Sequence, residues 1–379
     1  MHKIQMVDLK RQYNKIKAEV DTAIQHVIDT TDFINGSDVA AFSRELESYL
    51  GAKHVIPCAN GTDALQIALM ALGLEPGDEV ITPSFTYIAT VEVVALLRLK
   101  PVFVDVDADT YTMNLQSLKN AITPKTKAII PVHLYGQSAD LEPILALANE
   151  HNIPVIEDNA QAIGGDYTFS DGKKAKTGTM GTIGTTSFFP SKNLGCYGDG
   201  GAIFTNDAAL AEKMKMIANH GQKVRYYHEM VGCNSRLDTI QAAILRIKLR
   251  HLDEYCDARR AVADYYDHAF ANHPNIKTPY RAPYSKHVFH QYTMQLQGVD
   301  RNKVIQYLAD KGIPSMLYYP VPSHKQNMFK SLGGNDFQLP ITDMLQERVL
   351  SLPIHTELTE EELKFISENF LEAIKASRI

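Results

Sequence analysis

Three separate segments of this sequence carry residue types suited to binding an anion, pairing with a cation and attacking a carbonyl carbon. The first, residues 58–65, reads CANGTDAL and leads from an apolar run through Gly61 into an amphipathic pattern. A helix that begins here would direct free backbone N–H groups at a phosphate, and the Thr62 hydroxyl would add a donor. The alternative interpretation is that Thr62 or Asn60 only caps the helix.

Carboxylate and amide side chains follow a second apolar run, in residues 155–161, which read VIEDNAQ. In open α/β sheets ligands bind outside the carboxyl ends of the strands, so Asp158 is placed to meet a cofactor. Polar residues also gather at such ends as helix caps or solvated loop charges. This segment by itself does not separate the two interpretations.

A single lysine follows a third apolar run. Residues 185–201 read TTSFFPSKNLGCYGDGG, so Lys192 precedes a glycine cluster that allows close backbone packing. Partial burial would lower the pKa of Lys192 and provide a neutral amine able to form a Schiff base. A solvated loop lysine is the alternative for this segment alone.

The combination of the three segments is more informative than any one of them. An anion cradle, a strand-end carboxylate and a strand-end lysine are the groups that hold pyridoxal phosphate by its phosphate, ring nitrogen and aldehyde. Competing motifs fail: no G-x-G-x-x-G follows the first strand, residues 172–178 do not match G-x-x-x-x-G-K-[ST], and H-E-x-x-H is absent. The four cysteines are far apart and the histidines lack ligand spacing, so no metal site is predicted.

These segments need a scaffold that brings them together. After an N-terminal helical segment at residues 13–30, short apolar runs alternate with helical runs, which predicts an α/β layer architecture. Most of the short runs are continuously apolar, as in a central and largely parallel sheet covered on both faces. The predicted strands are residues 54–58, 79–83, 101–106, 128–132, 154–157, 185–189 and 201–205.

The chain has 379 residues, which exceeds the size at which one hydrophobic core keeps growing, so two unequal domains are expected. The longest helical pattern, residues 237–270, carries the boundary. We predict a large domain over residues 1–250 and a smaller α+β domain over residues 251–379. The smaller one should hold a strand at 291–297, a helix at 301–311 and a last helix with a capping box from Thr359 to Glu362.

Composition and charge argue against several classes of protein. The hydrophobic share of 45% and the charged share of 22% are near the averages for globular proteins, which disfavours a disordered or fibrous chain. A net charge of -6 gives no general reason to bind nucleic acid. The first residues lack a signal-peptide pattern, and the longest apolar stretch, residues 91–104, is interrupted by charges. We therefore expect a cytoplasmic protein with no nucleic-acid or membrane partner.

With these residues identified, the sequence resembles the sugar aminotransferases of the DegT/DnrJ/EryC1/StrS family, which are fold-type I pyridoxal-phosphate enzymes. The matching segments follow in order over nearly the whole chain: NGT at 60–62, GDEV at 77–80, ED at 157–158, SFFPSK at 187–192, HG at 220–221, GCNSR at 232–236 and YPVPSH at 319–324. The resemblance implies a large domain with a mostly parallel, seven-stranded sheet flanked by helices, and a smaller α+β C-terminal domain.

Carried over by position, the resemblance implies roles for residues around the cofactor ring. Lys192 would carry the cofactor as a Schiff base and act as the catalytic residue. Asp158 would pair with the pyridine nitrogen, and Gln161 would approach the ring hydroxyl. Tyr87 aligns with the aromatic residue that stacks on the ring.

The resemblance also implies how the phosphate is held and how the chain assembles. Gly61, Thr62 and Ser187 would bind the phosphate, together with Asn234 of the partner subunit. Members of the family are homodimers with two shared active sites, so a homodimer is expected.

Two longer strings, ANGTDALQ at 59–66 and KNLGCYGDGG at 192–201, resemble one subgroup of the family. Its members aminate C3 of UDP-linked 2-acetamido-2-deoxy-3-keto-glucuronate for bacterial surface polysaccharide, such as the O-antigen of lipopolysaccharide. The usual amino donor in the family is glutamate, which leaves as 2-oxoglutarate. Arg236 is a candidate for binding a carboxylate of donor or sugar, with a structural ion pair as the alternative. Tyr318, Tyr319 and His324 are the other candidates for substrate binding.

Two positions depart from the subgroup: Tyr318 stands where a histidine is familiar, and Asn159 replaces a small residue. Aminotransferases for other nucleotide ketosugars, either dTDP-3-keto or UDP-4-keto hexoses, stay open as alternatives. A ketosugar dehydratase on the same fold has a histidine where Lys192 stands. A non-catalytic regulator that binds the cofactor is disfavoured by the complete set of cofactor groups and by the lack of a basic recognition helix.

Overall fold

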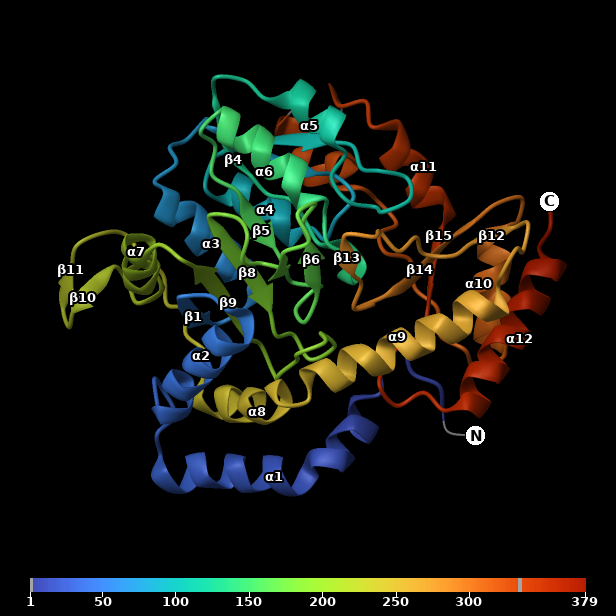
Figure 1. Cartoon of the computed structure of the whole chain (residues 1–379), viewed down its shortest axis with the longest axis horizontal. Helices are drawn as coiled ribbons and strands as arrows, with labels where there is room; N and C mark the ends of the chain where they lie inside the picture. The colour runs from blue at the N-terminus through green and yellow to red at the C-terminus, as the bar shows by residue number, and fades with distance from the viewer. Residues whose placement is uncertain (1–2, 333–335) are drawn as a thin grey trace.

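A sheet of seven strands forms the centre of the computed structural model, which describes residues 3–332 and 336–379 (Figure 1). The strand order is β1-β9-β8-β5-β4-β2-β3, and parallel bridges between residues 129 and 155 and between 132 and 158 join β4 to β5. Of these seven strands, β9 runs opposite to the other six. The strands are β1 (His54–Cys58), β2 (Glu79–Pro83), β3 (Lys100–Val104), β4 (Thr126–Ile129), β5 (Ile156–Asp158), β8 (Ile183–Ser187) and β9 (Gly201–Thr205).

The predicted fold is confirmed, because all seven predicted strands form and the sheet is buried on both faces. Neighbouring residues of one strand enter different cores: Ile56 packs in the cluster that contains helices α3 and α7, whereas Val55 packs with helices α2 and α8. This alternation explains why the strands are apolar without a polar side. The helices that cover the sheet are α2 (Ser37–Leu50), α3 (Gly61–Leu72), α4 (Ala89–Leu96), α5 (Leu115–Ala121), α6 (Leu141–Glu150), α7 (Ala208–Ala218) and α8 (Thr239–Leu249).

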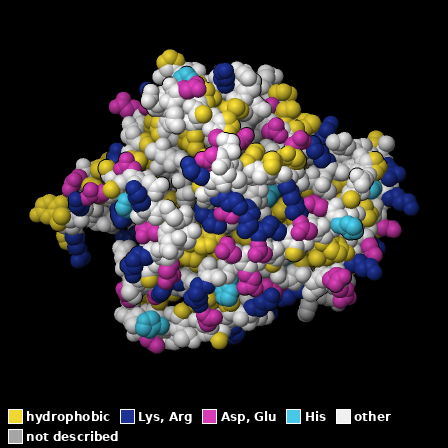
Figure 2. Space-filling model, in the orientation of Figure 1, with side chains coloured by type: hydrophobic (Ala, Val, Ile, Leu, Met, Phe, Trp, Pro, Cys, Tyr) yellow, Lys and Arg dark blue, Asp and Glu magenta, His cyan; other side chains and the backbone are white. Residues whose placement is uncertain are grey.

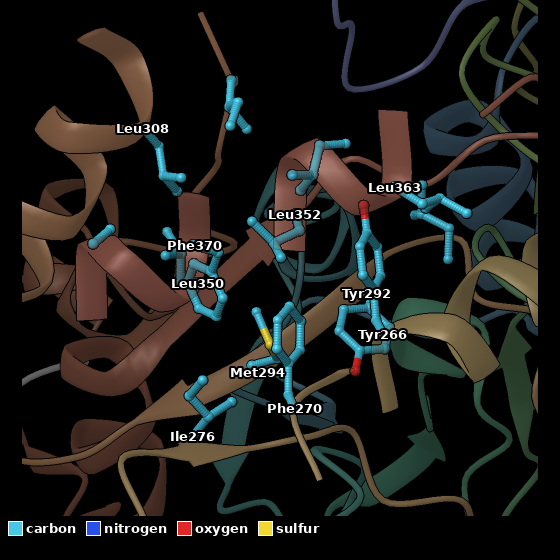
Figure 3. Close-up of a cluster of buried hydrophobic side chains, with 14 of the residues drawn as sticks. Tyr266, Phe270, Ile276, Tyr292, Met294, Leu308, Leu350, Leu352, Leu363 and Phe370 are labelled. Atoms are coloured by element: carbon cyan, nitrogen blue, oxygen red, sulfur yellow. The ribbon is translucent and has the colours of Figure 1, made fainter. Parts of the chain in front are cut away.

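A second hydrophobic core lies in the C-terminal part, at the right of Figure 1. Helices α9 (Leu252–Ala269), α10 (Arg301–Asp310) and α12 (Glu360–Ala376) pack there against the antiparallel strands β12 (Ile276–Lys277), β14 (Tyr292–Leu296) and β15 (Val349–Leu352). Aromatic side chains lie at its centre (Figure 3), where the ring of Tyr266 is 5.7 Å from that of Phe270 and 5.0 Å from that of Tyr292. The predicted capping box is confirmed, since Thr359 and Glu362 bond each other's backbone N–H groups at the start of α12.

The prediction of one long helix over residues 237–270 is wrong. The helix stops at Leu249 and restarts as α9 at Leu252, and His251 between them leaves the helical conformation. The break allows α8 to pack beneath the sheet against α1 (Leu9–Thr30) and α2, while α9 continues toward the C-terminal core (Figure 1). Periodicity alone does not reveal such a break, because both helices keep an apolar face.

The predicted domain boundary at residue 250 falls within this break, and the division into two domains stays a prediction. The two parts also contact each other beyond α9. Strand β13 (Ser285–Lys286) pairs with β6 (Asp166–Thr168), and Arg11 of α1 forms an ion pair with Glu362 of α12. Remaining elements are β7 (Lys174–Lys176), β10 (Gln222–Val224), β11 (Tyr227–His228), α11 (Pro340–Arg348) and the short 3-10 turns Leu134–Gly136, Ser323–Lys325 and Asn327–Leu332.

Strands β10 and β11 form a hairpin that projects from the body of the molecule, at the left of Figure 1. Its side chains include exposed apolar groups, and the exposed fractions of Val224, Tyr226 and Tyr227 are 58%, 74% and 70%. In Figure 2 this tip carries both hydrophobic and basic side chains. Among the described residues, no helix is both long enough and apolar enough to cross a membrane.

Candidate active site

The N-terminus of α3 and the end of β8 form a cradle of hydrogen-bond donors. Asn60 caps α3, because its side-chain oxygen accepts a hydrogen bond from the Asp63 N–H at 2.8 Å. The capping interpretation therefore holds for Asn60, which leaves the half-buried Thr62 hydroxyl available in the first turn. The first N–H groups of a helix carry partial positive charge, so this terminus is suited to an anion.

Gly61 brings this helix end directly against Ser187. A Cβ atom at Gly61 would lie 2.7 Å from the Ser187 Cβ and 3.3 Å from its hydroxyl oxygen, which no real side chain tolerates. Gly201 is equally restricted, since a Cβ there would lie 2.4 Å from the carbonyl carbon of Asn60. The glycines thus permit the approach of α3 to β8, and the predicted phosphate ligands Gly61, Thr62 and Ser187 are assembled at one place.

Asp158 ends β5 at the same edge of the sheet, and its side chain is buried. One carboxylate oxygen accepts a hydrogen bond from the Ala160 N–H at 3.1 Å, and the other accepts one from the Thr90 hydroxyl at 2.7 Å. Sequence reasoning missed Thr90, because it lies on α4, far from Asp158 along the chain. The unusual Asn159 is buried and donates to the carbonyl of Thr177 at 3.0 Å.

Lys192 follows β8 in the Ser191–Asn193 turn, beside the carboxylate of Asp158. Burial lowers the pKa of Lys192 to about 8, while the negative charge of Asp158 acts in the opposite direction. The predicted depression of the lysine pKa is confirmed. The His290 ring nitrogen lies 3.5 Å from the lysine Nζ, and burial lowers the pKa of His290 well below its usual value. Sequence reasoning missed this neighbour as well, because no spacing relates the two residues.

Gln161 and two tyrosines line the site next to Asp158. The Gln161 side-chain oxygen accepts a hydrogen bond from the Tyr135 N–H at 2.7 Å, and its amide donates to the Tyr319 hydroxyl at 3.0 Å. The exposed ring of Tyr87 lies 6.0 Å from the ring of Tyr319. The loop that contains Tyr319, predicted to bind substrate, therefore reaches the residues predicted to bind the cofactor ring.

Tyr318 and His324 of the same loop form hydrogen bonds with other parts of the chain. The carbonyl of Tyr318 accepts a hydrogen bond from the Tyr135 hydroxyl. The buried His324 ring shares a hydrogen bond of 2.7 Å with the Ser84 hydroxyl, and its other nitrogen lies 3.5 Å from the Asp343 carboxylate. Burial lowers the pKa of His324, which favours the neutral ring. The predicted contacts of Tyr318 and His324 with substrate stay predictions.

Asn234 and Arg236 flank Ser235, whose hydroxyl accepts a hydrogen bond from the Ala59 N–H at 3.1 Å, next to the cradle. Asn234 is exposed and pairs with Asn219, whereas Arg236 lines a cavity of about 330 Å³ between α2, β1 and α7. The residues that line this cavity include neither Lys192 nor Asp158. Within the described part of the chain no carboxylate lies in salt-bridge distance of Arg236, so the alternative of a structural ion pair has no support here.

The chain as a whole can be compared with known proteins. A model of the DegT/DnrJ/EryC1/StrS aminotransferase family matches residues 14–371. The chain belongs to this family. Its members are nucleotide-sugar aminotransferases that depend on pyridoxal phosphate, so the predicted family, cofactor and enzyme class are confirmed.

Three similar proteins illustrate the range of the family. A Pseudomonas aeruginosa protein named UDP-2-acetamido-2-deoxy-3-oxo-D-glucuronate aminotransferase is 48% identical, over 96% of this chain and 98% of its own. An Acidithiobacillus ferrooxidans protein named UDP-N-acetyl-3-dehydro-alpha-D-glucosamine 3-aminotransferase is 45% identical, over 96% of each chain. The crystal structure of S. venezuelae DesV with a ketimine intermediate has a TM-score of 0.94 and 38% identity, over 100% of both chains.

The residues present fit pyridoxal phosphate. The cradle offers backbone N–H groups and two hydroxyls to a phosphate, and its glycines leave no side chain in the way. Asp158 keeps acceptor capacity on both oxygens, because each oxygen takes one hydrogen bond from the protein. Lys192 would supply the amine for an aldehyde.

We predict that Lys192→Ala abolishes amino transfer and leaves the fold intact. The side chain would provide the amine that holds the cofactor, and its half-buried position makes no contact on which the sheet depends. Turnover, thermal midpoint and the absorbance band of the bound cofactor should be measured together. The control is Lys176→Ala, which removes a lysine of β7 that forms an ion pair with Asp166 of β6. Amino transfer near the wild-type rate in Lys192→Ala would contradict the assignment.

The pH dependence of cofactor loading should follow the lowered pKa of Lys192. Because the neutral amine is the nucleophile, loading of the apo-protein should rise about tenfold per pH unit and level off above a pH of about 8. Stopped-flow absorbance between about pH 6.5 and 9.5 measures it, and the same titration of the cofactor with N-acetyl-lysine corrects for the cofactor's own ionisation. A rate still rising steeply at the upper end would indicate a lysine with an ordinary pKa.

Proposed function

We propose that this enzyme transfers the amino group of glutamate to C3 of UDP-2-acetamido-2-deoxy-3-keto-D-glucuronate. The similarity to the P. aeruginosa protein of that name, over nearly the whole of both chains, carries the proposal. Glutamate would leave as 2-oxoglutarate, and the amino sugar would be a precursor of a bacterial surface polysaccharide such as O-antigen. The enzyme would work in the cytoplasm.

The closest competing substrate is the same sugar with a hydroxymethyl group in place of the carboxylate, as in the name of the A. ferrooxidans relative. Arg236 is the residue that could distinguish them. A guanidinium that lines a cavity and has no carboxylate of the described chain beside it is available for a ligand carboxylate, which it binds through two parallel hydrogen bonds.

We also propose that the active enzyme is a homodimer in which Arg236 and Asn234 of one chain complete the site of the other. Two observations support this arrangement. The Arg236 cavity has neither Lys192 nor Asp158 in its lining, and the projecting β10–β11 hairpin exposes apolar side chains of the kind that a second copy would cover (Figure 2).

The chain's own residues account for the steps of the reaction. Bound pyridoxal phosphate supplies an aldehyde for the amine and a ring that withdraws electrons from the carbon being deprotonated. Asp158 would hold the proton on the ring nitrogen, and the N-terminus of α3 would fix the phosphate. Lys192, with its lowered pKa, would carry a proton between donor and cofactor carbons. Tyr87 and Tyr319 would shield the reacting carbon from water.

Arg236→Ala should lower kcat/KM for the uronate about thirtyfold and leave kcat/KM for the hydroxymethyl sugar nearly unchanged. Loss of a hydrogen-bonded contact between charged groups costs ~2 kcal/mol, which corresponds to that factor. Coupled assays of both sugars in wild type and variant test it. Arg44→Ala, which removes an exposed guanidinium of α2 outside the cavity lining, is the matched control.

A wild type that uses both sugars equally well would contradict the substrate assignment and favour a neutral ketosugar. An Arg236→Ala variant that keeps a wild-type preference for the uronate would contradict only the role of Arg236 in reading the carboxylate.

Shared sites can be tested by mixing two variants that are each impaired on the uronate. If Lys192 of one chain works with Arg236 of the other, Lys192→Ala and Arg236→Ala chains recombine to give one intact site in each heterodimer. Random mixing should then restore about a quarter of the wild-type activity on the uronate. Each variant taken alone through the same unfolding and refolding serves as the control. No recovery after mixing, with heterodimers demonstrated by mass spectrometry, would mean that each site is built from one chain.

A further inference from the structure

The Asp158 carboxylate has a buried hydroxyl partner, Thr90, that has no part in the proposed steps of the reaction. Thr90 lies in the first turn of α4, only 1% of its surface is exposed, and its hydroxyl is 2.7 Å from one Asp158 oxygen. The other Asp158 oxygen accepts from the Ala160 N–H at 3.1 Å. The carboxylate therefore has one donor on each oxygen, which fixes the rotation of its plane.

The surrounding distances identify Asp158 as the acceptor of the Thr90 proton. Besides Asp158, the Thr90 oxygen lies 3.2 Å from the Tyr87 carbonyl and 3.3 Å from the Thr86 hydroxyl. The hydroxyl has one proton, and the shortest contact is to the carboxylate, where a charge-assisted hydrogen bond is strongest. The Thr86 hydroxyl can then donate to the Thr90 oxygen. The result is a chain of donors from Thr86 through Thr90 to Asp158, in which each bond strengthens the next.

The same short segment also carries Tyr87, the residue predicted to stack on the cofactor ring. Tyr87 and Thr90 are three residues apart at the start of α4, so the positions of the ring and the hydroxyl both depend on this helix end. Any shift of this helix end would change the stacking residue and the partner of Asp158 together.

We propose that Thr90 is a positioning residue for the reaction: its hydroxyl holds the Asp158 carboxylate in the orientation that receives the protonated ring nitrogen of the cofactor. Without the Thr90 hydroxyl, the carboxylate would rotate more freely and would meet the ring nitrogen in a poorer geometry. The ring is then a weaker acceptor of electrons, although the phosphate cradle and Lys192 still hold the cofactor.

The direct test is the nitrogen-15 chemical shift of cofactor labelled at the ring nitrogen and loaded into Thr90→Val. Valine keeps the shape of threonine and lacks the hydroxyl. We expect the signal to move toward that of the unprotonated ring, and the single-turnover rate constant with glutamate to fall about tenfold or more. The KM for glutamate should change much less than kcat, because Thr90 does not contact the donor. Thr90→Ser, which keeps the hydroxyl, should restore both values to within about threefold.

A second buried hydroxyl offers a matched control. Thr185 is 1% exposed and donates to the backbone carbonyl of Glu157 at 3.2 Å, on the strand beside Asp158. Thr185→Val makes the same change of atoms without touching the carboxylate and should leave the nitrogen-15 signal in place. The proposal is wrong if Thr90→Val keeps the wild-type signal and rate. It is equally wrong if Thr90→Ser behaves like Thr90→Val, or if Thr185→Val shifts the signal as much.

The proposal rests on the aminotransferase reaction and on the pairing of Asp158 with the ring nitrogen, but not on which sugar is aminated. Asp158→Asn serves as the reference for complete loss of the charged partner. If Asp158→Asn leaves the nitrogen-15 signal unchanged, the pairing of Asp158 itself is wrong. If Asp158→Asn shifts the signal and Thr90→Val does not, only the role of Thr90 fails. If Thr90→Val does not fold, Thr90→Ala is measured in its place, with the same expectations.

Discussion

The close backbone contact between Gly201 and Asn60 is the constraint on which the active site depends. Strand β9 begins at Gly201, which is in register with the last residue of β1 and with Ser187, the last residue of β8. The start of β9 thus lies between the carboxyl ends of β1 and β8, which run parallel to each other. A Cβ atom at Gly201 would separate the start of α3 from this edge. Because none is present, the phosphate donors and the turn that carries Lys192 share one edge of the sheet.

A second buried interaction holds Asp158 at that edge. The carboxylate of the preceding residue, Glu157, is fully buried and accepts hydrogen bonds from the ring of His133 and from backbone N–H groups of residues 178, 180 and 181. The Nδ1 atom of His133 accepts a hydrogen bond from the Ala139 N–H at 3.1 Å. The ring proton is therefore on Nε2, which donates a hydrogen bond to Glu157. This network connects the end of β4 to the end of β5. Removing the buried carboxylate would leave several buried donors without partners and would lower the stability of the fold.

Burial and the charge of Asp158 have opposite effects on the pKa of Lys192, and the resulting pKa suits a lysine that acts as a nucleophile. Removal from water favours the neutral amine, whereas the Asp158 carboxylate favours the ammonium, and burial is the stronger effect. A lysine with a pKa of about 8 has an appreciable neutral fraction near neutral pH and still binds a proton easily. The same carboxylate would pair with the ring nitrogen, so one side chain would act on both the lysine and the cofactor.

The sequence alone determined those structural elements and candidate site residues that show in the pattern of neighbouring residues. Strand runs, the NGT turn, Asp158 and Lys192 could be recognised because apolar periodicity, helix capping and strand-end polarity act between residues close along the chain. Tertiary structure decided the reversed direction of β9, the break between α8 and α9, the cavity around Arg236, and the contacts of Thr90 and His290 with the catalytic groups. These features join residues that are distant in sequence, and a single buried hydroxyl or imidazole has no periodic signature. Only packing brings such groups within hydrogen-bond distance.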